Sequence, residues 1–124
     1  MKAAFGSART IPASEQAKKI MAQLETKEVF AEQRDCWTLG ASIGIALGKT
    51  HSEGSRSTFQ NINSLDPEEI FAAIMLGLYP DLTPEERLKK LVDHAEAGIR
   101  EIFRMEQLGS LDFSTIGTSD NSTL

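Results

Sequence analysis

The sequence predicts an all-α fold, a compact bundle of about four helices around one apolar helix that contains glycines. Apolar residues recur at steps of three and four along most of the chain, which is the spacing of one helix face. Helix-start signals also recur, with Ser, Thr or Asp placed just before Glu or Pro. A length of 124 residues fits one domain with one core. We expect residues 1–12 to form a flexible lead-in, residues 13–116 the domain, and residues 117–124 a disordered tail.

The first predicted helix follows Pro12. Ser14 is a good N-cap residue, because its hydroxyl can accept a hydrogen bond from an unpaired amide of the first turn. An apolar face follows at helical spacing, made of Ala17, Ile20, Met21 and Leu24. We expect this face to lie on the core.

The second predicted helix, residues 27–47, is the centre of the expected bundle. Beyond Trp37 it is apolar on every side, which is typical of a helix buried by several neighbours. Gly40, Gly44 and Gly48 are four residues apart and form one stripe along it. An interior glycine costs about 1 kcal/mol of helix stability relative to alanine, so a repeated glycine indicates that another backbone approaches closely.

The glycine stripe has two interpretations. Close packing against a helix of the same chain is favoured, and a seam between copies in a homo-oligomer stays open. Trp37 is expected in the core, although an exposed Trp37 would be an interface anchor. Gly48 also suits a helix end, because glycine adopts the left-handed cap conformation without strain.

The segment of residues 49–63 is polar and lacks helical or alternating periodicity, which predicts a long surface loop. Loops of this length are uncommon in compact domains and are either functional or disordered. Lys49, His51 and Arg56 lie here among serine, threonine and amide side chains that can donate to phosphate oxygens. The sequence therefore makes these three residues candidates for a weak, salt-sensitive anion or DNA contact, with an unliganded polar loop as the plainer interpretation.

Two further helices are predicted after the loop. Asp66, Pro67 and Glu69 form a start signal for a short helix, and Thr83, Pro84 and Glu86 repeat it for a long one. The long helix is expected to end at Gly109 and to leave His94 on the surface. Residues 111–116 alternate apolar and polar side chains, which suggests an extended segment.

Composition and spacing exclude several classes of protein. A net charge of −5 does not suit a dedicated nucleic-acid coat, and no apolar run is long enough to cross a membrane. Cys36 is the only cysteine and residues 1–6 lack a signal-peptide core, so we expect a cytoplasmic protein. The run of residues 44–50 resembles a phosphate-binding P-loop, but three residues separate its glycines where four are required. No residues are placed as a metal site, a cofactor site or a catalytic group.

Residues 28–78 resemble a known protein family. The shared features are Val29-Phe30, Arg34-Asp35-Cys36-Trp37, Leu39-Gly40-Ala41, Gly44 and Gly48-Lys49. This pattern is similar to that of the small accessory proteins encoded with bacterial DNA phosphorothioation (Dnd) systems. The resemblance implies an association with DNA modification or phage defence, and it implies no reaction and no catalytic residue. The serine-rich, mildly basic loop after Gly48 departs from the family.

We therefore predict a non-enzymatic accessory or regulatory subunit that binds a protein partner and, weakly, DNA. Two alternatives stay open. One is a homo-oligomeric structural module without a nucleic-acid role, and the other is a small enzyme with its site in residues 49–63.

Overall fold

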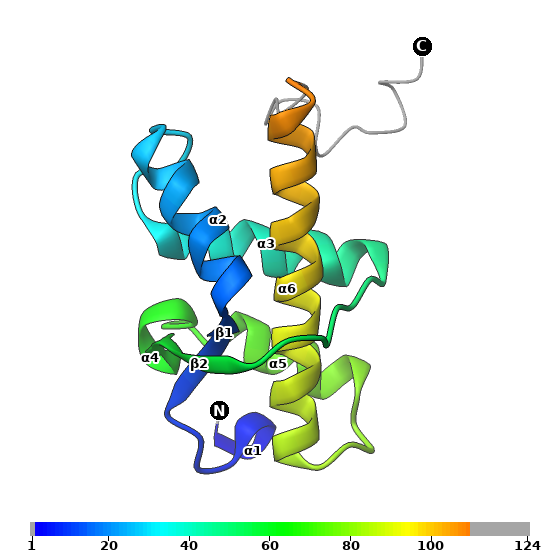
Figure 1. Ribbon diagram of the computed structural model, residues 1–124. Helices are drawn as coiled ribbons and strands as arrows, with labels where there is room; N and C mark the ends of the chain where they lie inside the picture. The colour runs from blue at the N-terminus through cyan, green and yellow to red at the C-terminus, as the bar shows by residue number, and fades with distance from the viewer. Residues whose placement is uncertain (1, 110–124) are drawn as a thin grey trace.

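The computed structural model describes residues 2–109, which are mostly helical with one small sheet (Figure 1). The elements run in the order α1 (Lys2–Phe5), β1 (Thr10–Ser14), α2 (Glu15–Thr26), α3 (Gln33–Leu47), β2 (Arg56–Asn61), α4 (Ile62–Leu65), α5 (Ile70–Leu78) and α6 (Pro84–Gln107). The predicted helical character is confirmed. The fold is not all-α, however, because β1 and β2 pair as an antiparallel sheet. The predicted extended segment at 111–116 and the tail at 117–124 lie outside the described residues.

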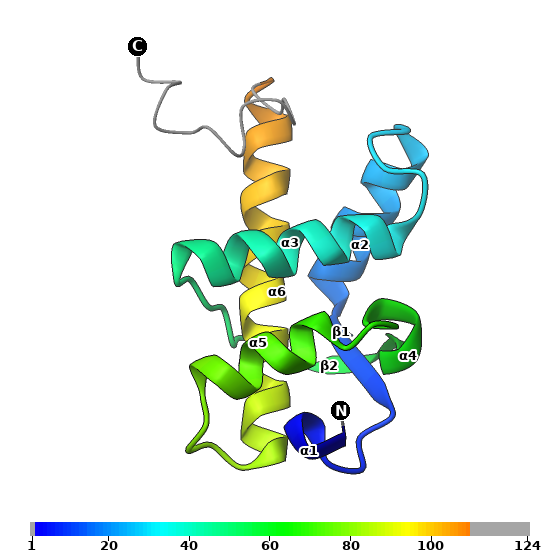
Figure 2. The same ribbon diagram turned by 180° about the vertical axis from the view of Figure 1, so that it is seen from behind.

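Helix α6 is the element on which the others pack, whereas the sequence placed residues 27–47 at the centre. Helices α1, α2, α3 and α5 and strand β1 all contact it. Figure 2 shows α3 and α5 crossing α6 on one side, and Figure 1 shows the 49–55 segment passing over the other, with β1 and β2 beside the helix. Apolar and polar groups of α6 are both buried, so its polar residues must find partners within the fold.

Helices α3 and α6 touch through their backbones. A Cβ added to Gly98 of α6 would lie 1.6 Å from the carbonyl oxygen of Gly40, and one added to Gly44 would lie 2.0 Å from that of His94. Glycine is required at this crossing because any side chain would hold the helices apart. The close approach inferred from the stripe therefore occurs within the chain at Gly40 and Gly44, with Gly98 as a partner that the sequence analysis did not select.

Helix α3 begins six residues later than predicted. Residues 27–32 form a turn in which Glu28 has a φ of 62°, a left-handed conformation that breaks the helical path. A new start follows, in which Glu32 and Asp35 form a reciprocal capping box. At the other end, the predicted terminator is confirmed, because Gly48 caps α3 with a φ of 65°.

The sheet corrects two predictions made from composition. The predicted flexible lead-in, residues 1–12, is ordered over residues 2–12, which include α1 and most of β1 and bury Phe5 and Ile11. Residues 49–63 are not one loop, since β2 and α4 occupy residues 56–65. Thr10 pairs with Asn61 and Ser14 with Arg56, with an irregular register between Ile11 and Pro12. Short polar strands that pair across more than 40 residues leave no local periodicity to detect.

The two later helix starts have different outcomes. Thr83 caps α6 with its hydroxyl, and Glu86 completes the predicted capping box. Helix α5 begins at Ile70 rather than directly after Asp66, because Glu69 is left-handed with a φ of 58°. The Asp66 carboxylate still serves this helix, since it accepts hydrogen bonds from the amides of Phe71 and Ala72 at 3.0 and 2.9 Å. Within residues 2–109 no helix combines the length and apolar character needed to cross a bilayer.

Candidate functional site

Lys49, His51 and Arg56, the predicted anion or DNA contacts, do not point toward one common site. Arg56 turns inward from the start of β2, and its Nη2 lies 2.8 Å from Oδ1 of Asp93 on α6. The same nitrogen donates to the carbonyl oxygen of His51 at 2.8 Å. The side chains of Arg56 and Asp93 are only 13% and 9% exposed. Arg56 is therefore a structural partner of a buried carboxylate, and we remove it from the predicted DNA contact.

Lys49 and His51 instead line a shallow hollow with residues of α6 that the sequence analysis did not select. The hollow has a volume of about 390 Å³ and includes Arg100, Arg104 and the acidic Glu101. Lys49 Nζ lies 3.7 Å from Glu101 Oε1, and Arg104 forms an ion pair with the same carboxylate. The hydrogen bond from Arg104 is the main cause that holds the pKa of Glu101 below its ordinary value. The hollow therefore carries more positive than negative side chains, and its one carboxylate, that of Glu101, is paired with Lys49 and Arg104.

The loop that carries Lys49 is held on α6 by buried polar groups. The backbone amide of His51 donates to the carbonyl oxygen of Asp93 at 3.0 Å. The Lys49 carbonyl lies 2.7 Å from Nδ1 of His94, which must donate because a carbonyl oxygen only accepts. The Nε2 atom of His94 lies 2.8 Å from the Tyr79 hydroxyl. His94 is 2% exposed, so its predicted surface position is wrong.

The predicted packing residues also belong to the interior. Trp37 is 1% exposed and makes an edge-to-face contact with Phe71 at a centroid distance of 5.6 Å. Gly40 and Gly44 are covered by α6, which leaves no stripe for a second copy of the chain. Gly48 is exposed with nothing within 4 Å of its Cβ position, so it serves as a helix cap and not as a packing contact.

A buried acid joins α2, β1 and α6. Glu96 Oε2 accepts from the Ser14 amide at 2.8 Å, and Oε1 accepts from the Ser14 hydroxyl and from Arg100 Nη1 at 2.7 Å each. The Ser14 oxygen in turn accepts from the Ala17 amide and caps α2, as predicted. Burial by itself raises the pKa of Glu96, but the hydrogen bonds from Arg100 and Ser14 outweigh it and lower the pKa. All these donors are used internally, so the network is structural.

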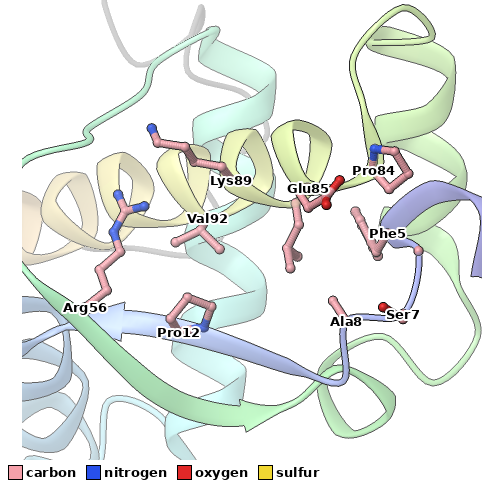
Figure 3. Close-up of a pocket in the computed structure, with 11 residues that line it drawn as sticks. Phe5, Ser7, Ala8, Pro12, Arg56, Pro84, Glu85, Lys89 and Val92 are labelled. Carbon is pink, nitrogen blue, oxygen red and sulfur yellow. The ribbon is translucent and has the colours of Figure 1, made fainter.

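A pocket of about 580 Å³ opens between the N-terminal segment, the sheet and the first half of α6 (Figure 3). Its apolar lining includes Phe5, Pro12, Leu88 and Val92. Figure 3 shows Arg56 and Lys89 together at one end and Glu85 beside Pro84 and Phe5 at the other. The volume lies within the range of about 300–1,000 Å³ that is typical of small-molecule sites. Sequence reasoning missed it because its walls come from three separate segments.

Helix α5 presents an apolar face to solvent. Ile70, Ile74 and Leu78, spaced by four residues, are 55%, 37% and 53% exposed. Ala73 and Gly77 are also exposed, and the opposite face buries Phe71, Ala72 and Met75. A surface helix that is apolar on both sides is unusual, and exposed apolar patches are typical of binding surfaces in general. Ile70, Ile74 and Leu78 therefore point away from the core.

Within residues 2–109 there is no group of three His, Cys, Asp or Glu side chains that could hold a metal ion. Cys36 is buried, and burial raises the pKa of its thiol to about 12. A thiol in this state is a poor nucleophile.

Comparisons of the chain with protein-family models, curated proteins and solved structures found no match.

Proposed function

We propose that this protein is a non-enzymatic accessory or regulatory subunit of a DNA-modification or phage-defence system in the cytoplasm, and that it acts by binding a protein partner. The exposed apolar face of α5 carries this proposal. Ile70, Ile74 and Leu78 form a continuous ridge on a helix that the rest of the domain covers on one side only. The resemblance of residues 28–78 to Dnd accessory proteins supports the biological setting, and α5 lies within that span.

Burial of the α5 ridge by a partner provides the driving force for association. Each fully buried Ile or Leu side chain contributes about 1.5–3 kcal/mol relative to its exposed state. The small residues Ala73 and Gly77 lie beside the ridge and allow a partner helix to approach closely. The expected occupant is therefore an apolar helix face on a protein of the modification or defence complex.

The experiment is a purification of tagged protein from its host at native expression, with the wild type compared with Ile74→Glu. Leu108→Glu is the matched control, because Leu108 is 66% exposed at the end of α6, far from α5. We expect DNA-modification or defence proteins to co-purify with the wild type and with the control, and to be lost with Ile74→Glu. Retention by Ile74→Glu contradicts the α5 surface, and a wild type without such partners contradicts the role.

A weak DNA contact is a second part of the proposal, at the hollow around Lys49. Lys49 and Arg104 are each 58% exposed, so both can reach a phosphate. Binding of duplex DNA at low salt should weaken in the double variant Lys49→Ala with Arg104→Ala, and should fall as salt is added. The matched control is Lys18→Ala with Lys19→Ala on α2. Wild-type protein that fails to bind at low salt rules this contact out.

The homo-oligomeric module is the alternative function, and the α5 ridge is the surface that favours it. The glycine stripe is already occupied by α6, so self-association would bring two α5 helices together. Light scattering separates the two functions. A monomer whose mass does not change with concentration excludes the oligomer, and a dimer that Ile74→Glu dissociates supports it. The other alternative, a small enzyme with its site in residues 49–63, stays a prediction, and loss of a measurable turnover on His51→Ala would support it.

A further inference from the structure

The pocket of Figure 3 combines an apolar wall with a cationic end. Phe5, Pro12 and Val92 approach from α1, β1 and α6, and these three residues can contact one chain of apolar atoms. Arg56 and Lys89 lie together at the end nearest β2. The pocket is thus suited to a molecule with one apolar part and one anionic part.

The cationic end holds more positive charge than its carboxylate can neutralise. The Asp93 carboxylate forms ion pairs with both Arg56 and Lys89. Arg56 Nη2 lies 2.8 Å from one of its oxygens and Lys89 Nζ lies 3.0 Å from the other. Two cations therefore share a single anion at this end of the pocket. A second carboxylate placed beside them would restore the balance of charge.

Arg56 also retains donors that the fold does not use. Its two contacts, to Asp93 and to the His51 carbonyl, are both made by Nη2. Its Nε is buried without a hydrogen-bond partner among residues 2–109, and so is Oδ1 of Asp93, which Arg56 contacts as an ion pair. A buried donor without a partner costs about 1–3 kcal/mol, so an added acceptor near this guanidinium would be favoured.

The opposite end of the pocket sets the direction of the ligand. Glu85 lies there, beside Phe5 and Pro84. A carboxylate at that end would be repelled by Glu85, whereas an apolar chain would contact Phe5 and Pro84. Only one orientation places both parts of the molecule against favourable neighbours.

We propose that this pocket binds a small amphiphilic carboxylate, with its carboxylate at Arg56 and Lys89 and its apolar chain along Val92 and Pro12 toward Phe5. The site is separate from the α5 ridge, so this inference does not depend on the proposed function. It assigns the domain a small-molecule ligand in addition to the protein partner proposed for α5.

Decanoate is the probe for this pocket, used with the full chain and followed by amide chemical shifts and by calorimetry. Decan-1-ol supplies the apolar chain without the charge, and acetate supplies the charge without the chain. We expect decanoate to shift the amides of residues 5–8 and 85–92 and to bind more tightly than either comparison compound. Equal binding of decan-1-ol, or shifts confined to other regions, would overturn the proposal.

Two variants test the roles of the two ends. Lys89→Gln should weaken decanoate binding about 5-fold, the size expected for one partly exposed charge pair. Lys90→Gln is the matched control, because the Lys90 ammonium lies over the Tyr79 ring and not in the pocket. Ala8→Phe should abolish binding by filling the pocket from an exposed position that leaves the core intact. Unchanged binding in Ala8→Phe, or equal effects of the two lysine variants, would contradict the site.

Discussion

Gly98→Ala should be one of the most damaging single-methyl additions in this domain. The new Cβ would lie 1.6 Å from the Gly40 carbonyl oxygen, and real Cβ atoms essentially never come closer than 3.0 Å to such an atom. The backbones of α3 and α6 would therefore have to separate by about 1.4 Å along that line. No flexible side chain can move aside to relieve the clash, because the methyl group is fixed directly to the α6 backbone and the atoms it meets are α3 backbone.

The expected loss of stability follows from two opposing terms. Overpacking a core typically costs about 1–3 kcal/mol, and a backbone collision belongs at the upper end of that range. Alanine recovers about 1 kcal/mol through its higher helix propensity. The net destabilisation is then about 2 kcal/mol or more, a large part of the roughly 5–15 kcal/mol that holds a typical domain together.

Gly77→Ala is the matched control, because it makes the same substitution on a helix where no atom lies within 4 Å of the new methyl group. It should raise stability by about 0.5 kcal/mol. Urea unfolding followed by circular dichroism and by the fluorescence of the buried Trp37 measures both variants. A Gly98→Ala protein within about 0.5 kcal/mol of the wild type would refute the backbone contact. Equal losses of stability in the two variants would show that the clash with the Gly40 carbonyl is not the cause of the destabilisation.

Three other predictions concern local chemistry. Asp66→Ala removes the acceptor for two amides at the start of α5 and should cost about 1–2 kcal/mol in urea unfolding, with Asp66→Asn costing less. The pKa of Glu96 is lowered in the folded state, so its stabilising contribution is present at neutral pH and is lost as the pH falls through and below the ordinary value of 4.5. Acid unfolding should therefore depend less steeply on pH in Glu96→Gln, although this variant starts from lower stability. Burial raises the pKa of Cys36 to about 12, so a thiol reagent at pH 8 should label the native protein far more slowly than the urea-unfolded protein.

The features that the sequence predicted correctly are governed by neighbouring residues. The capping box of Thr83 and Glu86 acts within one helical turn, and its signal is complete within four residues. The Ser14 cap and the glycine terminator at Gly48 are local in the same sense. The start of α3 was missed because the left-handed Glu28 interrupts a segment whose composition alone suits a helix.

The features that the sequence did not predict depend on residues far apart in the chain. The pairing of Ser14 with Arg56 forms the end of the sheet, and neither strand has an alternating apolar pattern. From the sequence, Arg56 was expected to be a free cation in a loop, because its carboxylate partner, Asp93, lies 37 residues away. Outward and inward apolar residues of α5 could not be separated, because every residue from Ile70 to Leu78 is apolar or small.

Buried polar groups on α6 fix the positions of several segments from the first 60 residues against this helix. Arg87 Nη1 donates to the Ala4 carbonyl at 2.8 Å, and Glu96 accepts from Ser14. Asp93 holds Arg56, and the next residue along α6 holds the Lys49 carbonyl. An apolar α6 would bury as much surface but would leave the position of each segment free, since hydrophobic contact is not directional.

Removing one partner from such a pair leaves a buried charge or dipole unsatisfied, which penalises every misplaced arrangement. The polar residues of α6 therefore select the topology. They also fix Lys49 and His51 beside Arg100 and Arg104, which is how a segment with no regular structure of its own becomes a defined surface.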